Sequence, residues 1–176
     1  MRLRTAVALS AAPAAVAALL LAASPGRAAS APTASAPAAC AASQLTVRAR
    51  AVPAEPSVVR LQVTNRGRVC TVDRIPTVTF GDLDGAATPV PPGESGPYRL
   101  TAGGTAHAAV RTVADPADPG ARRVATLTVA ADPALPGRTF TASELGAGDS
   151  IRVWEPVTTW WQASAAAADR AIGLSR

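Results

Sequence analysis

One serine in this chain has a local sequence of the kind seen around nucleophiles. Ser95 lies in Gly93-Glu-Ser-Gly-Pro97, which superficially resembles the serine segment of trypsin-like proteases. Those enzymes place a His and an Asp before the serine in the chain, whereas the single His here, His107, follows it. Pro97 also stands where a nucleophile elbow requires Gly. The sequence therefore favours a proline-rich loop at Ser95, and we predict no catalytic residue.

Two pairs of acidic residues have the spacing of weak metal-site candidates. Asp82 and Asp84 flank a leucine before a glycine, and Asp115 and Asp118 lie in a loop rich in Asp, Pro and Ala. A calcium loop needs further oxygen ligands at set spacing, and the residues that follow Asp84 are Gly-Ala-Ala-Thr-Pro. Turns are the favoured interpretation of both pairs. His107 alone is better explained as a surface or capped strand residue than as a ligand, so we predict no metal and no cofactor.

The tryptophans form the third candidate, a possible binding patch. Trp154, Trp160 and Trp161 are half of the six aromatic residues and lie within eight positions. On an exported domain they suit a sugar-stacking or partner-binding surface. The alternative, which we favour, is that a core poor in aromatics uses its largest side chains to close one end. Adjacent residues of an extended chain point to opposite sides, so Trp160 and Trp161 are predicted to differ in exposure.

The amino end determines the compartment in which this chemistry would take place. Residues 1–4 are basic, residues 5–23 are apolar, and small residues follow a Ser-Pro-Gly break, which is the order of a secretory signal peptide. An uncleaved membrane anchor is the alternative, but Pro13 and the many alanines weaken it. We predict an extracellular mature chain that begins near Ser30 and has no stable membrane span.

Two cysteines remain in the mature chain, Cys40 and Cys70. An even count in an oxidising compartment predicts a disulfide between them, with a loop of about thirty residues. Free thiols are disfavoured there, and a cysteine nucleophile lacks an obvious partner base.

Charge argues against a nucleic-acid partner. Without the three arginines of residues 1–29, the chain has 14 basic and 12 acidic residues, a net charge of +2. The arginines are scattered along the sequence rather than arranged in a stripe. An extracellular protein or a cell-wall component is the partner class that remains.

The elements that would position these residues are mostly short strands. Residues 1–29 are followed by an Ala/Ser/Pro linker at 30–39, a β domain at 40–162 and an Ala-rich tail at 163–176, which is predicted to be a frayed helix or disordered. Period-two alternation predicts strands at residues 45–51 and 58–64. Residues 57–72 are predicted to form a β-hairpin around the turn Asn65-Arg-Gly-Arg68.

Further strands are predicted at 77–80, 98–101, 105–113, 122–131, 138–142 and 150–154, with a long loop at 86–97. In the 122–131 strand, Ala125, Leu127 and Val129 are assigned to the core face. Seven or eight short strands separated by turns are typical of an all-β, immunoglobulin-like antiparallel β-sandwich.

Short motifs in this chain resemble those of a secreted actinobacterial family, the domain of unknown function 4232. They are Cys40-Ala-Ala-Ser-Gln-Leu45, Leu61-Gln-Val-Thr-Asn-Arg-Gly67, Cys70-Thr-Val72, Ile75-Pro-Thr-Val78, Asp82-Leu-Asp-Gly85, Leu100-Thr-Ala-Gly-Gly104 with Ala106-His-Ala108, and Ile151-Arg-Val-Trp-Glu-Pro156. The resemblance extends over most of residues 40–160 and implies a secreted, immunoglobulin-like fold without implying an activity. A second cysteine pair that many members carry near the carboxyl end is absent here.

Two classes of function follow from these observations. The first is a non-catalytic extracellular binding or surface-associated module, which the sequence favours. The second is a secreted enzyme of unrecognised type, which the lack of a His, acid and nucleophile set disfavours.

Overall fold

The domain consists of short β-strands with little helix. The computed structural model describes residues 36–174, so the predicted signal peptide lies outside the described residues. The elements in chain order are η1 (Ala42–Gln44), β1 (Leu45–Val52), β2 (Glu55–Asn65), β3 (Cys70–Asp73), β4 (Thr77–Phe80), β5 (Thr88–Val90), β6 (Pro97–Leu100), β7 (Thr105–Arg111), β8 (Arg122–Val124), β9 (Thr126–Ala130), β10 (Arg138–Thr141), α1 (Ala142–Leu145), β11 (Ile151–Val153), β12 (Val157–Thr159) and α2 (Ala165–Ala171).

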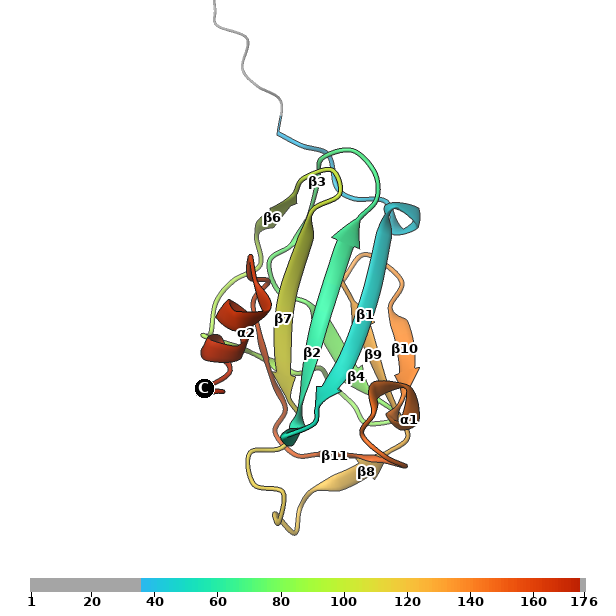
Figure 1. Cartoon of the computed structure of the whole chain (residues 1–176), viewed down its shortest axis with the longest axis vertical. Coiled ribbons are helices and arrows are strands. Elements are labelled where there is room, and N and C mark those ends of the chain that lie inside the picture. Colours follow the sequence, from blue (N-terminus) through green and yellow to red (C-terminus); the bar gives the residue numbers. More distant parts are fainter. Residues whose placement is uncertain (1–35, 175–176) are drawn as a thin grey trace, which may run out of the picture. The chain divides into compact units, whose positions relative to one another are not determined.

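The strands form four sheets (Figure 1). The largest has the order β1-β2-β7-β12-β5, and the second has the order β10-β9-β4. Two small sheets, β11-β8 and β3-β6, complete the domain. All pairs are antiparallel except β12 with β5. The mostly β, antiparallel prediction is confirmed, but residues 36–174 hold twelve strands rather than seven or eight.

The predicted alternation holds in the two longest strands. Val59, Leu61 and Val63 of β2 are at most 1% exposed, while Arg60, Gln62 and Thr64 between them reach the outer face. β1 pairs with β2 in a continuous antiparallel register from Leu45 to Ala51. A period of two therefore gives residues 59–64 of β2 one apolar and one polar side.

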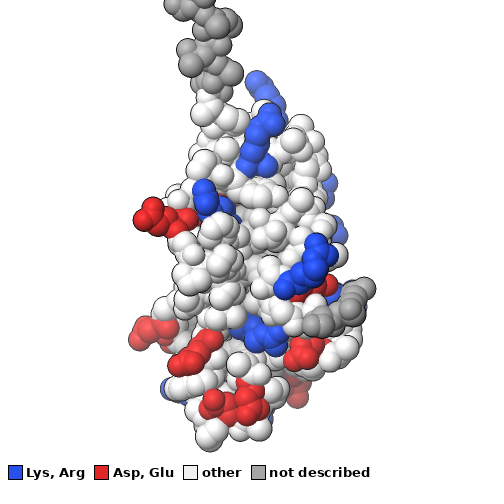
Figure 2. Space-filling view, turned by 90° about the vertical axis from the view of Figure 1, so that its left-hand side faces the viewer, with Lys and Arg blue, Asp and Glu red and all other residues white. Residues whose placement is uncertain are grey.

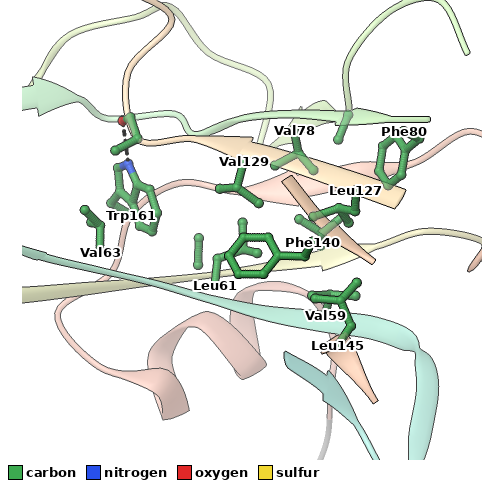
Figure 3. Packing of buried hydrophobic residues seen from close by; sticks show 14 of the residues in the cluster. Val59, Leu61, Val63, Val78, Phe80, Leu127, Val129, Phe140, Leu145 and Trp161 are labelled. Carbon is green, nitrogen blue, oxygen red and sulfur yellow. Dashed lines mark hydrogen bonds between the residues drawn. The ribbon is translucent and has the colours of Figure 1, made fainter. Parts of the chain in front are cut away.

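The main core lies between the five-stranded sheet and the three-stranded sheet (Figure 3). Large members from these two sheets and from the segment after β12 include Val59, Leu61, Val63, Val78, Phe80, Leu127, Val129, Phe140 and Trp161, and Leu145 of α1 packs with them. Apolar burial on this scale is the main favourable term in the folding of such a domain.

The hairpin predicted for residues 57–72 is wrong. β2 pairs with β1 and β7, whereas β3 pairs with β6 in a different sheet. The side chain of the buried Asn65 explains the change of sheet. Its amide donates to the carbonyls of Arg68 (2.7 Å) and Thr101 (3.0 Å), and its Oδ1 accepts from the Gly67 N–H (2.8 Å). These bonds direct the chain away from β2 and tie the turn to the end of β6.

The single strand predicted for residues 122–131 is two strands, β8 and β9, that belong to different sheets. The break lies at Ala125, whose carbonyl accepts from the Ala142 N–H of α1 (2.8 Å). Leu127 and Val129 are fully buried as predicted, but Ala125 is exposed.

Two short strands lie where none was predicted. β5 falls inside the predicted loop at 86–97, and β12 follows β11 after a three-residue connection. β5 is an edge strand, a position in which Pro89 is tolerated because an edge needs fewer backbone donors.

The predicted disulfide between Cys40 and Cys70 is present. The two residues are 4% and 3% exposed and belong to the main core. Ahead of Cys40, Ala39 pairs with Thr71, so the bridge and this pairing together hold the start of the domain against β3.

Residues 165–171 of the Ala-rich segment form helix α2, one of the two predicted alternatives, but the helix is packed against the sheet rather than frayed. Alanine has a high helix propensity, and Ser164 caps α2 by accepting from the Ala167 N–H (3.2 Å). Ala168 and Ile172 bury against Val58 and Ala109 on the outer face of the five-stranded sheet. Neither helix within residues 36–174 has the length and apolar character needed to cross a bilayer.

Candidate functional site

The three tryptophans do not form one patch. Trp161 is 3% exposed, lies in the main core and donates from its Nε1 to the Ala131 carbonyl (3.2 Å; Figure 3). Trp160 is half-buried beneath the Arg74 guanidinium, which lies 5.2 Å from the ring centroid. Trp154 is 43% exposed. The predicted difference in exposure between Trp160 and Trp161 is confirmed, and Trp154 alone presents a large aromatic surface to solvent.

Trp154 is positioned by the end of β11. Val153 before it is buried, and the Trp154 N–H donates to the Thr112 carbonyl (2.9 Å), which fixes the backbone. A Cβ placed on Gly120 would lie 3.3 Å from the indole ring, so the ring rests against that glycine. The indole therefore lies at the end of β11 and against the β7–β8 loop.

A hollow of about 250 Å³, called here the Trp154 hollow, lies beside this ring. Its wall is apolar at Phe80, Leu83 and Pro156 and polar at Asp84, Arg122 and Glu155. An aromatic face with a few charged groups around it is the usual composition of a small-ligand site.

Glu155 has an unusual backbone conformation in this wall. Its φ is +45°, in the left-handed region that residues other than glycine rarely adopt. The chain changes sheets here, from β11, which pairs with β8, to β12, which pairs with β7 and β5. Glu155 is exposed and lines the hollow together with Trp154. Such outliers concentrate at functional sites.

The end of the domain that carries Trp154 is rich in acids. Toward this lower end Figure 2 shows Asp and Glu side chains gathered together, whereas the charged side chains nearest the upper end are basic. Several of the acids have structural roles. Asp118 accepts from the Gly120 N–H (2.7 Å) and Asp115 accepts from the Ala117 N–H (2.8 Å), so both shape the loop under Trp154. Asp82 and Asp84 lie in the turn between β4 and β5. No cluster of three or more potential metal ligands is found among the residues the structure describes.

Ser95 and His107 lie on separate elements. Ser95 is exposed in the loop between β5 and β6. His107 lies on β7, where its backbone pairs with Gln62 and Gln162. Burial lowers the pKa of the His107 imidazole below its ordinary value of 6.5. Within residues 36–174 no hydrogen bond joins the two side chains.

Sequence reasoning missed a second hollow, on the outer face of the five-stranded sheet. Its volume is about 400 Å³, and its polar lining is Arg48, Arg50, Arg60, Gln62 and His107. The group formed by Arg48, Arg50 and Arg60 is called the arginine face below. The alternation in residues 45–51 already placed Arg48 and Arg50 on one side of a strand. The cluster was missed because the arginines are scattered along the sequence. The other polar lining residues come from β2 and β7, which lie at distant positions in the chain.

Arg60 of the arginine face is fixed by an ion pair. Its Nε and Nη2 donate to the two carboxylate oxygens of Asp169 at 2.7 and 2.8 Å, and Asp169 is 5% exposed. The hydrogen bond to Asp169 raises the pKa of the guanidinium above its ordinary value. Arg48 and Arg50 are exposed and have no ion pair in the described part of the chain.

Together these features define a mostly β domain that is closed by one disulfide near its start and by a buried tryptophan near its end. A family profile, the domain of unknown function (DUF4232), matches residues 40–161, from the first cysteine to the buried Trp161. The chain belongs to this family. Helix α2, which carries Asp169, lies beyond the matched residues. No curated protein and no solved structure matches the chain significantly.

Proposed function

We propose that this protein is an exported, non-catalytic binding module that contacts a saccharide of the cell envelope through the Trp154 hollow. The observation that carries this proposal is the exposure of Trp154. It is 43% exposed, its backbone N–H bonds to the Thr112 carbonyl, and its ring lies against Gly120. A tryptophan side chain has only two rotatable bonds, so it offers a large contact area and loses little conformational entropy when it stacks on a ligand.

The polar lining of the hollow supports a hydroxyl-rich ligand. The Asp84 and Glu155 carboxylates accept hydrogen bonds, and the Arg122 guanidinium donates them. A sugar ring has an apolar face that fits an indole and hydroxyl groups that need both donors and acceptors at its rim. The hollow has a volume of about 250 Å³, which suits a short stretch of a longer sugar chain.

The module is proposed to be non-catalytic because, within residues 36–174, no base forms a hydrogen bond with the hydroxyl of the candidate nucleophile Ser95. Ser95 lies in the β5–β6 loop, and the single His is on β7 of the five-stranded sheet. The proposal of an immunoglobulin-like arrangement is supported by the core that the two larger sheets share. The proposal of export is supported by the disulfide and by the order of residues 1–29, which runs from basic through apolar to small residues.

The experiment that tests binding uses the indole N–H signals of the three tryptophans. An N-acetylglucosamine tetramer is titrated into ¹⁵N-labelled mature protein, and isolated peptidoglycan is used in a sedimentation assay. The Trp154 indole signal is expected to shift while that of Trp161 stays in place. Trp154→Ala should abolish sedimentation with peptidoglycan.

The matched control is Val69→Ala, because Val69 is the other exposed large hydrophobic residue of the described chain, at 38%, and it lies in the β2–β3 connection. It should leave binding unchanged. Sedimentation of the Trp154→Ala variant to the same extent as the parent would refute the proposal. Export is tested separately by sequencing the amino end of protein from culture supernatant, which is expected to begin near Ser30.

A further inference from the structure

The arginine face has an arrangement that costs stability in the absence of a ligand. Arg50 of β1 lies directly opposite Arg60 of β2 in the antiparallel register. Like charges at directly opposed positions destabilise a strand pair. Arg48, two residues before Arg50, lies on the same face opposite Gln62. Three guanidinium groups therefore share one small area of the sheet.

The acidic residues of the molecule compensate only one of these three charges. All twelve Asp and Glu residues of the sequence lie within residues 36–174. Asp169 pairs with Arg60 from outside the 400 Å³ hollow, and no acidic side chain is among the residues that line the hollow. Arg48 and Arg50 thus leave an uncompensated positive charge on this face.

Hydrogen-bonding groups that lack partners surround the same space. Gln62 lies opposite His107, and both side chains are half-buried at the floor of the hollow. Neither side chain has a hydrogen bond within the described residues. The Asp169 carboxylate holds the Nε and Nη2 of Arg60, so its Nη1 stays available to a ligand. Donors from three neighbouring strands therefore converge on one polar hollow.

We propose that the arginine face binds a linear chain of phosphate groups. The guanidinium fork matches the oxygens of a phosphate in a two-point geometry, which makes Arg the preferred residue for this anion. Arg48 and Arg50 are two residues apart on one strand, about 7 Å, so they can contact successive groups of one chain rather than a single ion. The fixed guanidinium of Arg60 and the amide of Gln62 contact the same chain from β2.

This site is distinct from the Trp154 hollow, and the two share no lining residue. It also does not depend on the proposed saccharide ligand. The two proposals therefore succeed or fail separately.

The test is an NMR titration of the mature protein with sodium tripolyphosphate, with inorganic phosphate as the single-group comparison. Tripolyphosphate should shift the Gln62 amide signals and the His107 ring signals and leave the Trp154 indole signal in place. Because more than one arginine is engaged, tripolyphosphate should bind at least about tenfold more tightly than phosphate.

The variant Arg48→Gln/Arg50→Gln should weaken tripolyphosphate binding by about tenfold or more. Its matched control is Arg68→Gln/Arg99→Gln, which removes the same charge from two exposed arginines at the β3–β6 end of the domain. Binding in this control should remain within about twofold of the parent, a change that corresponds to less than one charge-assisted hydrogen bond. Equal losses in the two variants, equal affinity for phosphate and tripolyphosphate, or shifts away from β1, β2 and β7 in the parent would each overturn the proposal.

Discussion

The Trp154 hollow and the arginine face use different parts of the fold. The hollow is built from connections between strands, with walls from the β4–β5 turn and the segment between β11 and β12. The arginine face is built from side chains on two long paired strands, β1 and β2. A ligand-contacting residue in a connection needs special backbone devices, such as Gly120 and the left-handed Glu155. A residue on a strand is placed by alternation and register alone.

The two regions also differ in charge and in the role of their carboxylates. The end that carries Trp154 is rich in carboxylates, several of which are used to shape loops. The arginine face has one carboxylate, supplied by α2. Changes to the scaffold should therefore affect the two regions unequally, which allows them to be separated by experiment.

The largest effect is expected from removal of the disulfide. Cys40→Ser with Cys70→Ser opens a loop of about thirty residues and should lower the free energy of unfolding by roughly 3–4 kcal/mol in the chain-entropy model. β1 begins only five residues after Cys40, so its amides should lose more protection from hydrogen exchange than those of β11. A double variant that melts with the parent, or equal loss of protection in both strands, would contradict this prediction.

A smaller effect is expected when the ion pair of the arginine face is broken. Arg60→Met leaves the buried Asp169 without its partner and should cost about 1–3 kcal/mol in chemical denaturation. The control is Arg50→Met, at the directly opposed position on the same face. Arg50 has no ion pair within residues 36–174, so its replacement should change stability by no more than about 0.5 kcal/mol. Similar losses in both variants would show that the ion pair with Asp169 contributes little.

Replacement of Gly120 or Gly93 by alanine should show that the surroundings of Trp154 and Trp160 change independently of each other. A Cβ on Gly120 would press on the Trp154 ring at 3.3 Å, and one on Gly93 would overlap the Trp160 ring. Gly120→Ala should shift the Trp154 indole signal alone, at a cost below about 1 kcal/mol, since a displacement of a few tenths of an ångström relieves the contact. Gly93→Ala should shift the Trp160 signal alone. Movement of both indole signals in either variant would indicate one connected tryptophan cluster.

Local sequence was sufficient for features that repeat along a strand. The alternation of Val59, Leu61 and Val63 with polar residues predicted the buried face of β2, and the same rule separated Trp160 from Trp161. The even cysteine count predicted the bridge, because the predicted export implies an oxidising compartment and two cysteines allow only one pairing.

Features that depend on a distant partner were not accessible from local sequence. Asn65-Arg-Gly-Arg68 has the composition of a hairpin turn. Its direction is set by Asn65 bonds to carbonyls that lie 35 and 36 residues away. The break at Ala125 depends on α1. The packing of α2 depends on Arg60, 109 residues away, which donates a hydrogen bond to Asp169. The arginine face was missed for the same reason, since it exists only once β1 and β2 are in register.

The smallest expected effect concerns His107, whose pKa should respond to a ligand at the arginine face and not to one at the Trp154 hollow. Burial lowers the pKa of His107 in the folded protein below the 6.5 of an exposed imidazole. Between these two values the unfolded chain binds more protons, so stability should decrease as pH falls below about 6.5. His107→Gln should lack this part of the pH dependence in thermal melts. The charged groups that line the hollow with His107 are Arg48, Arg50 and Arg60, and Asp169 pairs with Arg60. Tripolyphosphate bound there favours the protonated ring and should raise the pKa of His107 in an NMR titration, because an opposite charge stabilises the imidazolium. An N-acetylglucosamine tetramer bound at the Trp154 hollow should leave that pKa unchanged, and a pKa that responds equally to both ligands would show that the two regions are coupled.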